Sequence, residues 1–306
     1  MTVYESTEIE QKKESAVTLG NFDGIHKGHQ KLINTVKEYA EKDGLTSIVF
    51  SFYPHPVYVL GDGKKYYSIL STEEKIHAME KLGVDALIQY PFTKEFASWE
   101  TKKFFELLYY KVKCRVLVVG ENYYFGRNRS GNYETLKKYG DIYGVKVIKI
   151  NSVMDNDERV SSTRIRKCIF EKNFEEANRL LNKEYFIIGN VAQGKKIGRK
   201  IGFPTANLVE DDEKLLPPDG VYVTKTQIGD KIYNSMTNIG KNPTLNGTER
   251  TVETHLFDFE EDIYGEKIKV MFLQWLRDDV KFENIEQLES QLHKDMKSVK
   301  KIFDEM

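Results

Sequence analysis

The sequence predicts an α/β Rossmann-like domain followed by an antiparallel β-barrel domain with a C-terminal helix. In the first half, short continuous apolar stretches alternate with segments of helical periodicity, which indicates a parallel sheet covered on both faces. Near residue 184 the pattern changes to alternating strands separated by Gly-containing turns, which favours an antiparallel sheet or barrel. An amphipathic stripe at about 285–303 predicts the final helix.

The individual elements follow from the same patterns. In the first half we expect strands at 16–20, 47–52, 86–90, 115–119 and 145–150, and helices near 28–42, 72–82, 100–112 and 132–143. A last helix is expected from Ser161 to about Leu181, with serine or threonine as its N-cap. In the second half we expect strands at 185–191, 220–228, 231–239, 252–259 and 267–276. The expected domains are residues 1–183 and 184–306.

Composition limits the classes of function. A chain of 306 residues holds about two domains, and its net charge of −1 without a long basic run argues against nucleic acid as a partner. The polar N-terminus and the lack of an apolar stretch of about 20 residues argue against a signal peptide and a membrane span. Cys114 and Cys168 lack the number and spacing for a disulfide framework or a metal site. We expect a cytoplasmic protein, and the oligomeric state stays open.

Residues 20–29, Gly-Asn-Phe-Asp-Gly-Ile-His-Lys-Gly-His, are the most informative segment. They join the first expected strand to a helix, where free backbone amides and the positive end of the helix dipole favour phosphate. His26 and His29, three residues apart, could both donate hydrogen bonds to one phosphate group. The alternative is a Gly-rich turn with two solvated histidines. The pattern indicates phosphate chemistry on a nucleotide.

This run resembles the signature of the nucleotidylyltransferase superfamily, which includes FAD synthetases and cytidylyltransferases. The resemblance implies that the histidine pair, His26 and His29, binds the nucleotide phosphates and stabilises the transition state of nucleotidyl transfer. It also implies nucleotide contacts for the residues that precede the pair, which are Gly20, Asn21, Phe22 and Asp23.

Three further segments fit the same pocket: 51–56, 120–126 and 159–166. Taken alone, each could be a rigid turn, plain packing or a helix cap. Together they resemble the adenylyltransferase half of prokaryotic FAD synthetases, over most of residues 14–182. The resemblance implies that Asn122 lies near the adenosine and the flavin phosphate. It implies contacts with the ATP triphosphate for Arg159, Ser162, Thr163 and Arg166.

A second candidate site lies at 189–208, which contains a Gly-rich basic stretch and the run Phe-Pro-Thr-Ala-Asn. The glycines Gly194, Gly198 and Gly202 would let the backbone fold over phosphates. Thr205 and Asn207 offer neutral oxygen ligands of the kind that Mg²⁺ accepts. A Gly-rich turn between strands would explain the glycines alone.

This stretch resembles riboflavin kinase, and the resemblance continues over about 183–303. It implies that the Pro-Thr-Ala-Asn motif binds Mg-ATP and that Glu253 is the catalytic base for the terminal ribityl hydroxyl of riboflavin. An ordinary exposed strand glutamate is the alternative. Arg277 and Phe282 would border the flavin ring.

The two resemblances together imply one bifunctional enzyme with riboflavin, FMN and ATP as its small-molecule substrates and Mg²⁺ as its cofactor. The barrel would phosphorylate riboflavin to FMN, and the first domain would transfer adenylyl from ATP to FMN. A non-catalytic flavin sensor is one alternative, although sensing does not require a base at Glu253. A cytidylyltransferase is another, which a kinase half that produces FMN makes less favourable.

Overall fold

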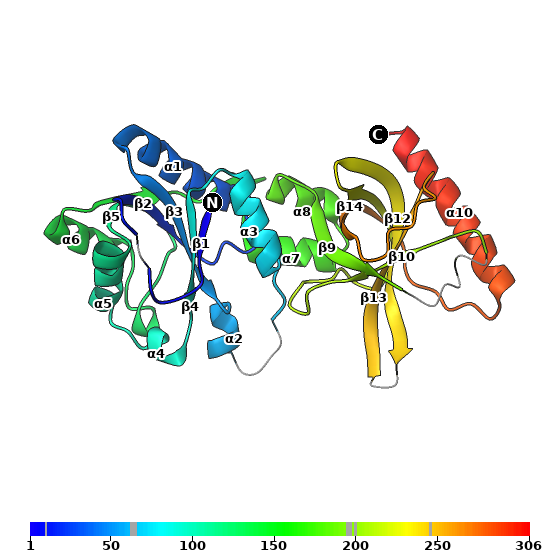
Figure 1. Cartoon of the computed structure of the whole chain (residues 1–306), viewed down its shortest axis with the longest axis horizontal. Coiled ribbons are helices and arrows are strands. Elements are labelled where there is room, and N and C mark those ends of the chain that lie inside the picture. Colours follow the sequence, from blue (N-terminus) through cyan, green and yellow to red (C-terminus); the bar gives the residue numbers. More distant parts are fainter. Residues whose placement is uncertain (10, 62–65, 194–197, 199–200, 245–246) are drawn as a thin grey trace. The chain divides into compact units, whose positions relative to one another are not determined.

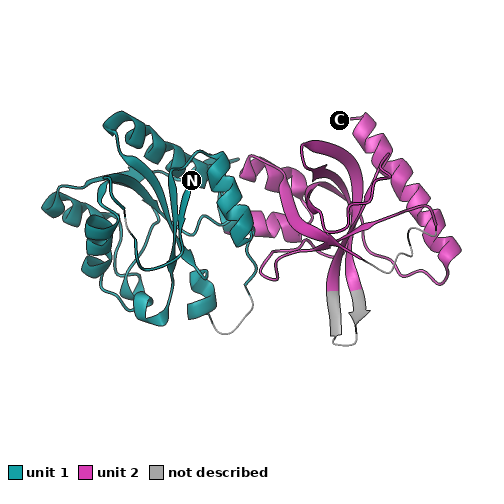
Figure 2. Cartoon of the chain, in the orientation of Figure 1, with its two compact units in different colours: residues 1–162 teal, residues 163–306 magenta. Residues whose placement is uncertain are grey.

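The chain forms two compact units, residues 1–162 and 163–306 (Figure 2). The structure is a computed structural model that describes residues 1–9, 11–61, 66–193, 198, 201–244 and 247–306. The domain boundary expected after residue 183 stays a prediction. Among the described helices, none combines the length and the apolar character that crossing a membrane would need.

The first unit is built on a six-stranded parallel sheet (Figure 1). The strand order is β1-β4-β3-β2-β5-β6, so the central strand β2 has later strands on both sides. The bounds are β1 Thr2–Tyr4, β2 Ser15–Leu19, β3 Thr46–Tyr53, β4 Ala86–Pro91, β5 Cys114–Gly120 and β6 Lys146–Ile150. All residues of β2 are buried, as expected for a strand covered on both faces. The sequence prediction missed β1.

Helices connect these strands, and a short hairpin of β7 and β8 follows the sheet. Local caps explain where several helices begin and end; for example, Ser71 and Glu74 form a capping box on α3. The bounds are α1 Lys27–Asp43, α2 Pro56–Leu60, α3 Thr72–Lys81, α4 Lys94–Ala97, α5 Thr101–Glu106, the π-helical turn Leu107–Lys111, the 3-10 turn Arg127–Arg129, α6 Tyr133–Tyr143, β7 Met154–Asp155 and β8 Glu158–Arg159.

The strand order places a topological switch point between β2 and β5. After β2 the chain continues on one side of the sheet, and it returns to the other side at β5. In open parallel sheets, ligands bind in the crevice beyond the carboxyl ends of the strands at this point. The loop that begins at Gly20 and the loop after Gly120 therefore meet where a ligand is expected.

The second unit contains a closed antiparallel barrel with the order β10-β13-β12-β11-β14-β9. The bounds are α7 Ser162–Phe170, α8 Phe174–Leu181, β9 Tyr185–Ala192, β10 Ala206–Val209, β11 Gly220–Ile228, β12 Lys231–Thr244, β13 Gly247–Leu256, β14 Lys267–Arg277 and α10 Ile285–Asp304. The predicted fold class is confirmed in both halves. The short strand β10 was not predicted, and it pairs with β9 and β13 to complete the barrel.

Two predicted elements are wrong in detail. The helix expected over 161–181 is two helices, because Lys172 adopts a left-handed backbone (φ 63°) and the Asn173 side chain caps α8 by accepting a hydrogen bond from the Glu176 amide at 3.1 Å. The strand expected over 252–259 ends at Leu256, since Asp258 has a φ of 54° and leaves the strand conformation.

The two faces of the barrel wall carry different residues. Inside, hydroxyls of five buried residues bond to one another: Thr224, Thr226, Ser235, Thr237 and Thr254. Outside, buried residues of β11 and β12 join an apolar cluster that includes Val299 of α10. Because side chains alternate along a strand, each strand of this wall presents its odd and even positions to different surroundings.

Candidate functional sites

The loop between β2 and α1 carries the first site. It lies at the carboxyl edge of the parallel sheet, and it ends at His26, the N-cap of α1. The Nδ1 atom of His26 accepts a hydrogen bond from the backbone amide of His29 at 3.3 Å. The loop therefore leads into a helix N-terminus at the switch point, where backbone amides and the helix dipole favour an anion.

The conformation of this loop is held by its burial and by one carboxylate. Phe22 and Ile25 have φ values of 52° and 48°, a backbone region that costs bulky residues about 1–3 kcal/mol. Both side chains are buried. The Asp23 carboxylate accepts hydrogen bonds from the amides of Ile69 and Leu70 at 2.8 and 3.3 Å, which ties the loop to the segment before α3. The nucleotide contact expected of Asp23 stays a prediction.

The two histidines lie ring against ring, with centroids 3.7 Å apart and planes at 15°. Burial lowers the pKa of His26 from 6.5 to about 4, and the nearby Arg159 cation acts in the same direction against the raising effect of Asp23. His26 is therefore neutral at pH 7. Because its Nδ1 accepts the His29 amide, the proton of the neutral ring is on Nε2, which leaves an N–H donor for a ligand oxygen.

Other residues predicted for this site come from the end of the first unit. Arg159 lies on β8 close enough to influence the charge state of His26. The neighbouring strand β7 carries Asp155, whose carboxylate pairs with Lys27 at 3.4 Å. The Ser162 hydroxyl donates to the backbone carbonyl of Asp23 at 2.8 Å. The structure therefore brings Arg159 and Ser162 to the histidine loop.

Thr163 and Arg166 belong to the second unit. They lie on α7, where Thr163 is exposed and Arg166 is half-buried. Their expected contact with the ATP phosphates stays a prediction.

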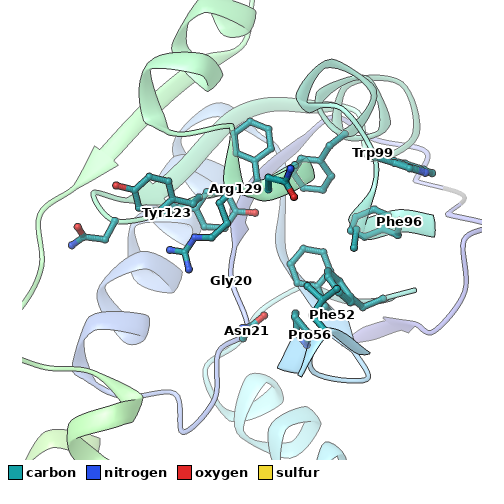
Figure 3. Close-up of a pocket in the computed structure, with 17 residues that line it drawn as sticks. Gly20, Asn21, Phe52, Pro56, Phe96, Trp99, Tyr123 and Arg129 are labelled. Atoms are coloured by element: carbon teal, nitrogen blue, oxygen red, sulfur yellow. The ribbon is translucent and has the colours of Figure 1, made fainter. Parts of the chain in front are cut away.

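A pocket of about 480 Å³ opens beside the histidine loop (Figure 3). Figure 3 shows Phe52, Phe96 and Trp99 on one side of it and Tyr123 and Arg129 on the other. Its apolar and aromatic walls suit a flat ring system, and the few polar groups at its edge suit the polar end of such a ligand.

Three predicted residues line this pocket: Gly20 and Asn21 after β2, and Asn122 after β5. Asn122 is exposed, and its Nδ2 contacts Glu121 Oε1 at 3.4 Å and Ser152 Oγ at 3.5 Å. Phe96 and Trp99 also line the pocket, and no sequence motif predicted this role for them. Their spacing is that of ordinary packing residues, so only their position in the folded sheet identifies them.

The second site lies on the barrel. Asn207 of β10 and Glu253 of β13 are directly opposite each other in the antiparallel pairing. Such residues point to the same face with Cβ atoms about 4.5–5.5 Å apart. Thr205 immediately precedes β10, and the carbonyl of Pro204 is 2.8 Å from Nδ1 of His255, which fixes this segment to β13. The predicted threonine, asparagine and glutamate therefore lie together.

The glycines before this segment are only partly described. Gly194 and the basic residues 195, 196, 199 and 200 lie outside the described residues. Gly198 lies close to the backbone of Phe203: its carbonyl accepts the Phe203 amide at 2.9 Å, and a Cβ would come within 2.2 Å of the Phe203 oxygen. Gly202 has a φ of 77°, which favours glycine.

The donor set on the barrel fits magnesium. A threonine hydroxyl, an asparagine amide oxygen and a carboxylate are hard oxygen ligands, and Mg²⁺ commonly takes few protein ligands together with phosphate and water. Within the described part of the chain, no group of three or more His, Cys, Asp and Glu residues could form an all-protein metal cage. A metal at Thr205 and Asn207 would therefore depend on a phosphate ligand.

A pocket of about 250 Å³ adjoins Thr205. The segment after β13 supplies its acidic side, with Glu260, Glu261 and Asp262, while Val191 and Leu256 supply apolar wall. No sequence motif identifies these acidic residues, and their place beside Thr205 appears only in the closed barrel.

The two residues expected at the flavin ring differ in their surroundings. The Arg277 guanidinium bonds both carboxylate oxygens of Asp295 on α10, at 2.7–3.0 Å, and donates to the Asp278 carbonyl at 2.8 Å. Arg277 therefore fixes α10 to the end of β14. Phe282 is half-buried in the segment before α10. Flavin contacts of both residues stay predictions.

Comparisons with known proteins cover both units. Residues 8–164 match the FAD synthetase family, and residues 181–303 match the riboflavin kinase family. A bifunctional riboflavin kinase/FMN adenylyltransferase of Bacillus subtilis is 35% identical over 97% of this chain and 95% of its own length. One from Buchnera aphidicola is also 35% identical, over 95% of this chain and 94% of its own length.

A crystal structure described as a macrolide-efflux protein from Streptococcus pneumoniae has the same fold. It aligns with a TM-score of 0.89 at 36% identity and covers 98% of this chain and 99% of its own. That description concerns transport, whereas the family matches and the curated relatives concern flavin enzymes, and both enzyme signatures are present here. This chain belongs to the family of bifunctional riboflavin kinase/FMN adenylyltransferases.

Proposed function

We propose that this protein makes FAD from riboflavin in two ATP-dependent steps, one in each unit. The observation that carries the proposal is that each unit holds a set of groups suited to one of the two reactions. The first unit has a stacked histidine pair, of which His26 is neutral, beside an aromatic pocket. The barrel has a carboxylate, Glu253, directly opposite the amide of Asn207.

In the barrel, the terminal ribityl hydroxyl of riboflavin attacks the γ-phosphorus of ATP. The new O–P bond forms as the bond to ADP breaks, and Glu253 takes the hydroxyl proton. An alcohol needs such a base because it is a poor nucleophile while protonated. Glu253 is half-buried on this face of the barrel, on the strand that pairs with Asn207.

In the first unit, a phosphate oxygen of FMN attacks the α-phosphorus of ATP and pyrophosphate leaves. This nucleophile already carries negative charge, so the reaction needs alignment and charge stabilisation more than a base. His26 and His29 would donate to the phosphate oxygens, with Arg159 adding positive charge beside them. The aromatic pocket would hold the flavin ring beside the start of the histidine loop, at Gly20 and Asn21.

Magnesium is part of this proposal. Thr205 and Asn207 would hold it in the barrel, and the bound ion would neutralise charge on the phosphate oxygens. A cytoplasmic location, where riboflavin and ATP are both available, also belongs to the proposal.

The test is incubation of the purified protein with riboflavin, ATP and Mg²⁺, followed by chromatography of the flavins. FMN should appear first and FAD should follow, and FMN supplied directly should also give FAD. A protein that yields neither product would be a flavin-binding regulator, and the proposal would be wrong.

A further inference from the structure

The row of polar residues on the barrel does not end at Glu253. Asn238 of β12 is directly opposite Glu253 on its other side, as Asn207 of β10 is on the first. Three neighbouring strands therefore present an amide, a carboxylate and a second amide at one level. Residues paired in this way share a face, and their Cβ atoms are about 4.5–5.5 Å apart. Asn238 is thus as near to the carboxylate as Asn207 is.

The neighbours of this row identify the face. Thr237 and Thr254, which adjoin Asn238 and Glu253 in the sequence, bond to each other inside the barrel at 2.9 Å. Met236, two residues before Asn238, belongs to the apolar cluster that contains Val299 of α10. Because alternate residues share a face, Asn238 and Glu253 point to the outer side of the wall, the side on which α10 packs.

The row of paired residues continues from Asn238 across β11 to β14, where it ends at an ion pair. Val221 of β11 is opposite Asn238, and Arg277 of β14 is opposite Val221. The Arg277 guanidinium is bound by the buried Asp295 of α10. The row thus runs from the proposed metal ligand to the ion pair that fixes α10, with Asn238 beside the proposed base.

The side-chain oxygen of Asn238 can accept a hydrogen bond that no described residue supplies. Its Oδ1 atom is buried and makes no hydrogen bond to any residue in the described part of the chain. A buried acceptor without a partner is unfavourable, so such an atom in a functional site is completed by a donor from outside the chain, which is a water or a ligand group. The hydroxyls on adjacent carbons of a polyol chain are donors of the kind that would complete it.

Gly240 lies beside the Asn238 amide, and its lack of a side chain leaves space there. The φ of Gly240 lies outside the left-handed region, so its backbone conformation does not require glycine. An added Cβ would lie 3.2 Å from Nδ2 of Asn238 and 3.5 Å from Oδ2 of Asp279. A side chain at this position would therefore crowd the Asn238 amide.

We propose that Asn238 binds the ribityl chain of riboflavin and directs its terminal hydroxyl toward Glu253. Its Oδ1 accepts a hydrogen bond from a ribityl hydroxyl, while Gly240 leaves the room for the chain. This inference rests on the proposed kinase activity of the barrel. It adds a substrate-binding residue that acts on the polyol chain and has no part in holding the flavin ring.

The test compares riboflavin with lumiflavin, which has the flavin ring but no ribityl chain. Asn238→Leu removes the amide at similar volume. We expect kcat/KM for riboflavin phosphorylation to fall about 10- to 100-fold, through a lost hydrogen bond and a misaligned hydroxyl. The KM for ATP and the inhibition constant of lumiflavin against the kinase reaction should each change less than about twofold. Gly240→Ala should produce the same selective loss.

Asn234→Leu is the matched control, because Asn234 is exposed on the same strand, and it should leave all these values unchanged. Equal weakening of riboflavin and lumiflavin in Asn238→Leu would mean a structural role and would overturn the proposal, as would unchanged kcat/KM. Riboflavin phosphorylation by the wild-type protein tests the proposed kinase activity separately. If the wild type forms no FMN, that assignment fails whatever the variants do.

Discussion

The histidine loop and the polar row on the barrel both suit phosphate chemistry, yet they are built from opposite kinds of group. Among the residues predicted for the loop site, Asp23 is the one with a carboxylate. That carboxylate accepts hydrogen bonds from backbone amides of the segment before α3. The groups here that suit a bound anion are donors: the stacked rings of His26 and His29, a helix N-terminus and Arg159. On the barrel the paired groups are amides and a carboxylate.

This difference follows from the two nucleophiles. The phosphate of FMN is already an anion, so a site for its attack needs donors and cations, and a carboxylate there would repel it. The hydroxyl of riboflavin must lose a proton as it attacks, so its site needs an acceptor at the reacting oxygen. The architectures match these needs. A helix N-terminus supplies donors, while strand register places a carboxylate at a defined distance from its neighbours.

The largest effect should come from removing the acceptor on the barrel. Glu253→Gln keeps the shape of the side chain but cannot take the hydroxyl proton. We expect riboflavin phosphorylation to fall about 10²- to 10⁴-fold while FMN adenylylation stays at the wild-type rate. Both rates are measured by chromatography of the flavin products.

Glu266→Gln, an exposed position in the same unit, serves as the control and should retain both activities. Comparable loss of both reactions in Glu253→Gln would contradict the separation of the two sites.

Removing a hydrogen-bond donor from the histidine loop should slow FMN adenylylation and leave riboflavin phosphorylation unchanged. We expect His29→Ala to slow FMN adenylylation about 10²- to 10³-fold, the usual effect of losing one donor to a transition state, so that FMN accumulates from riboflavin. His77→Ala changes an exposed histidine of the same unit and should not affect either step. Normal FAD formation by His29→Ala would show that this ring has no role in the transfer.

The aromatic pocket should affect binding of the flavin and leave binding of the nucleotide unchanged. Trp99 lines the pocket, and Trp99→Ala removes ring area that would cover the flavin. We expect the KM for FMN to rise about 10- to 50-fold at an unchanged KM for ATP, because stacking and apolar burial are lost. Tyr110→Ala, an exposed aromatic position, is the control for general destabilisation. A rise in the KM for ATP alone would place the nucleotide in this pocket.

The last expected effect is on stability and its pH dependence, and we expect no change in substrate selectivity from it. The pKa of His26 is about 4 in the folded protein and 6.5 in the unfolded chain, so the unfolded state binds more protons between these values. Stability of the first unit should therefore decrease as pH falls from 6.5 toward 4, by at most about 1.4 kcal/mol per pH unit from this group. Above pH 6.5 the group makes no pH-dependent contribution.

Calorimetric unfolding of wild type and His26→Asn at several pH values measures this difference, since asparagine keeps a cap acceptor without titrating. The unfolding temperature of the variant should depend less steeply on pH between 6.5 and 5. Parallel pH dependence of the two proteins would show that His26 titrates normally.

Much of the fold could be predicted because its main elements have clear periodicity. The buried strand β2, the barrel strands β9, β11 and β14 and the helix α10 lie within one residue of the predicted bounds. The strands β1 and β10 were missed because three and four residues are too short for a period to register. The break between α7 and α8 had a local signal in Asn173, an N-cap residue followed three positions later by Glu176.

The sites divide in the same way. Candidate residues within a continuous motif, such as His26 and His29, could be proposed from their spacing. Asn238 could not, since its place beside Glu253 depends on the register between two strands, and a shift of one residue would turn it to the other face. Phe96 and Trp99 resemble packing residues until the fold places them in one pocket wall.

The central claim is that one chain holds two separate sites, one in each unit, and that FMN made at the barrel site is the substrate of the site in the first unit. Its most direct test is complementation between Glu253→Gln and His29→Ala, each incubated with riboflavin, ATP and Mg²⁺, alone and mixed. Alone, the first variant should leave riboflavin largely unchanged and the second should stop at FMN, whereas the mixture should form FAD. If the mixture forms no more FAD than the separate variants, the two activities are not separable in this way and the account is wrong.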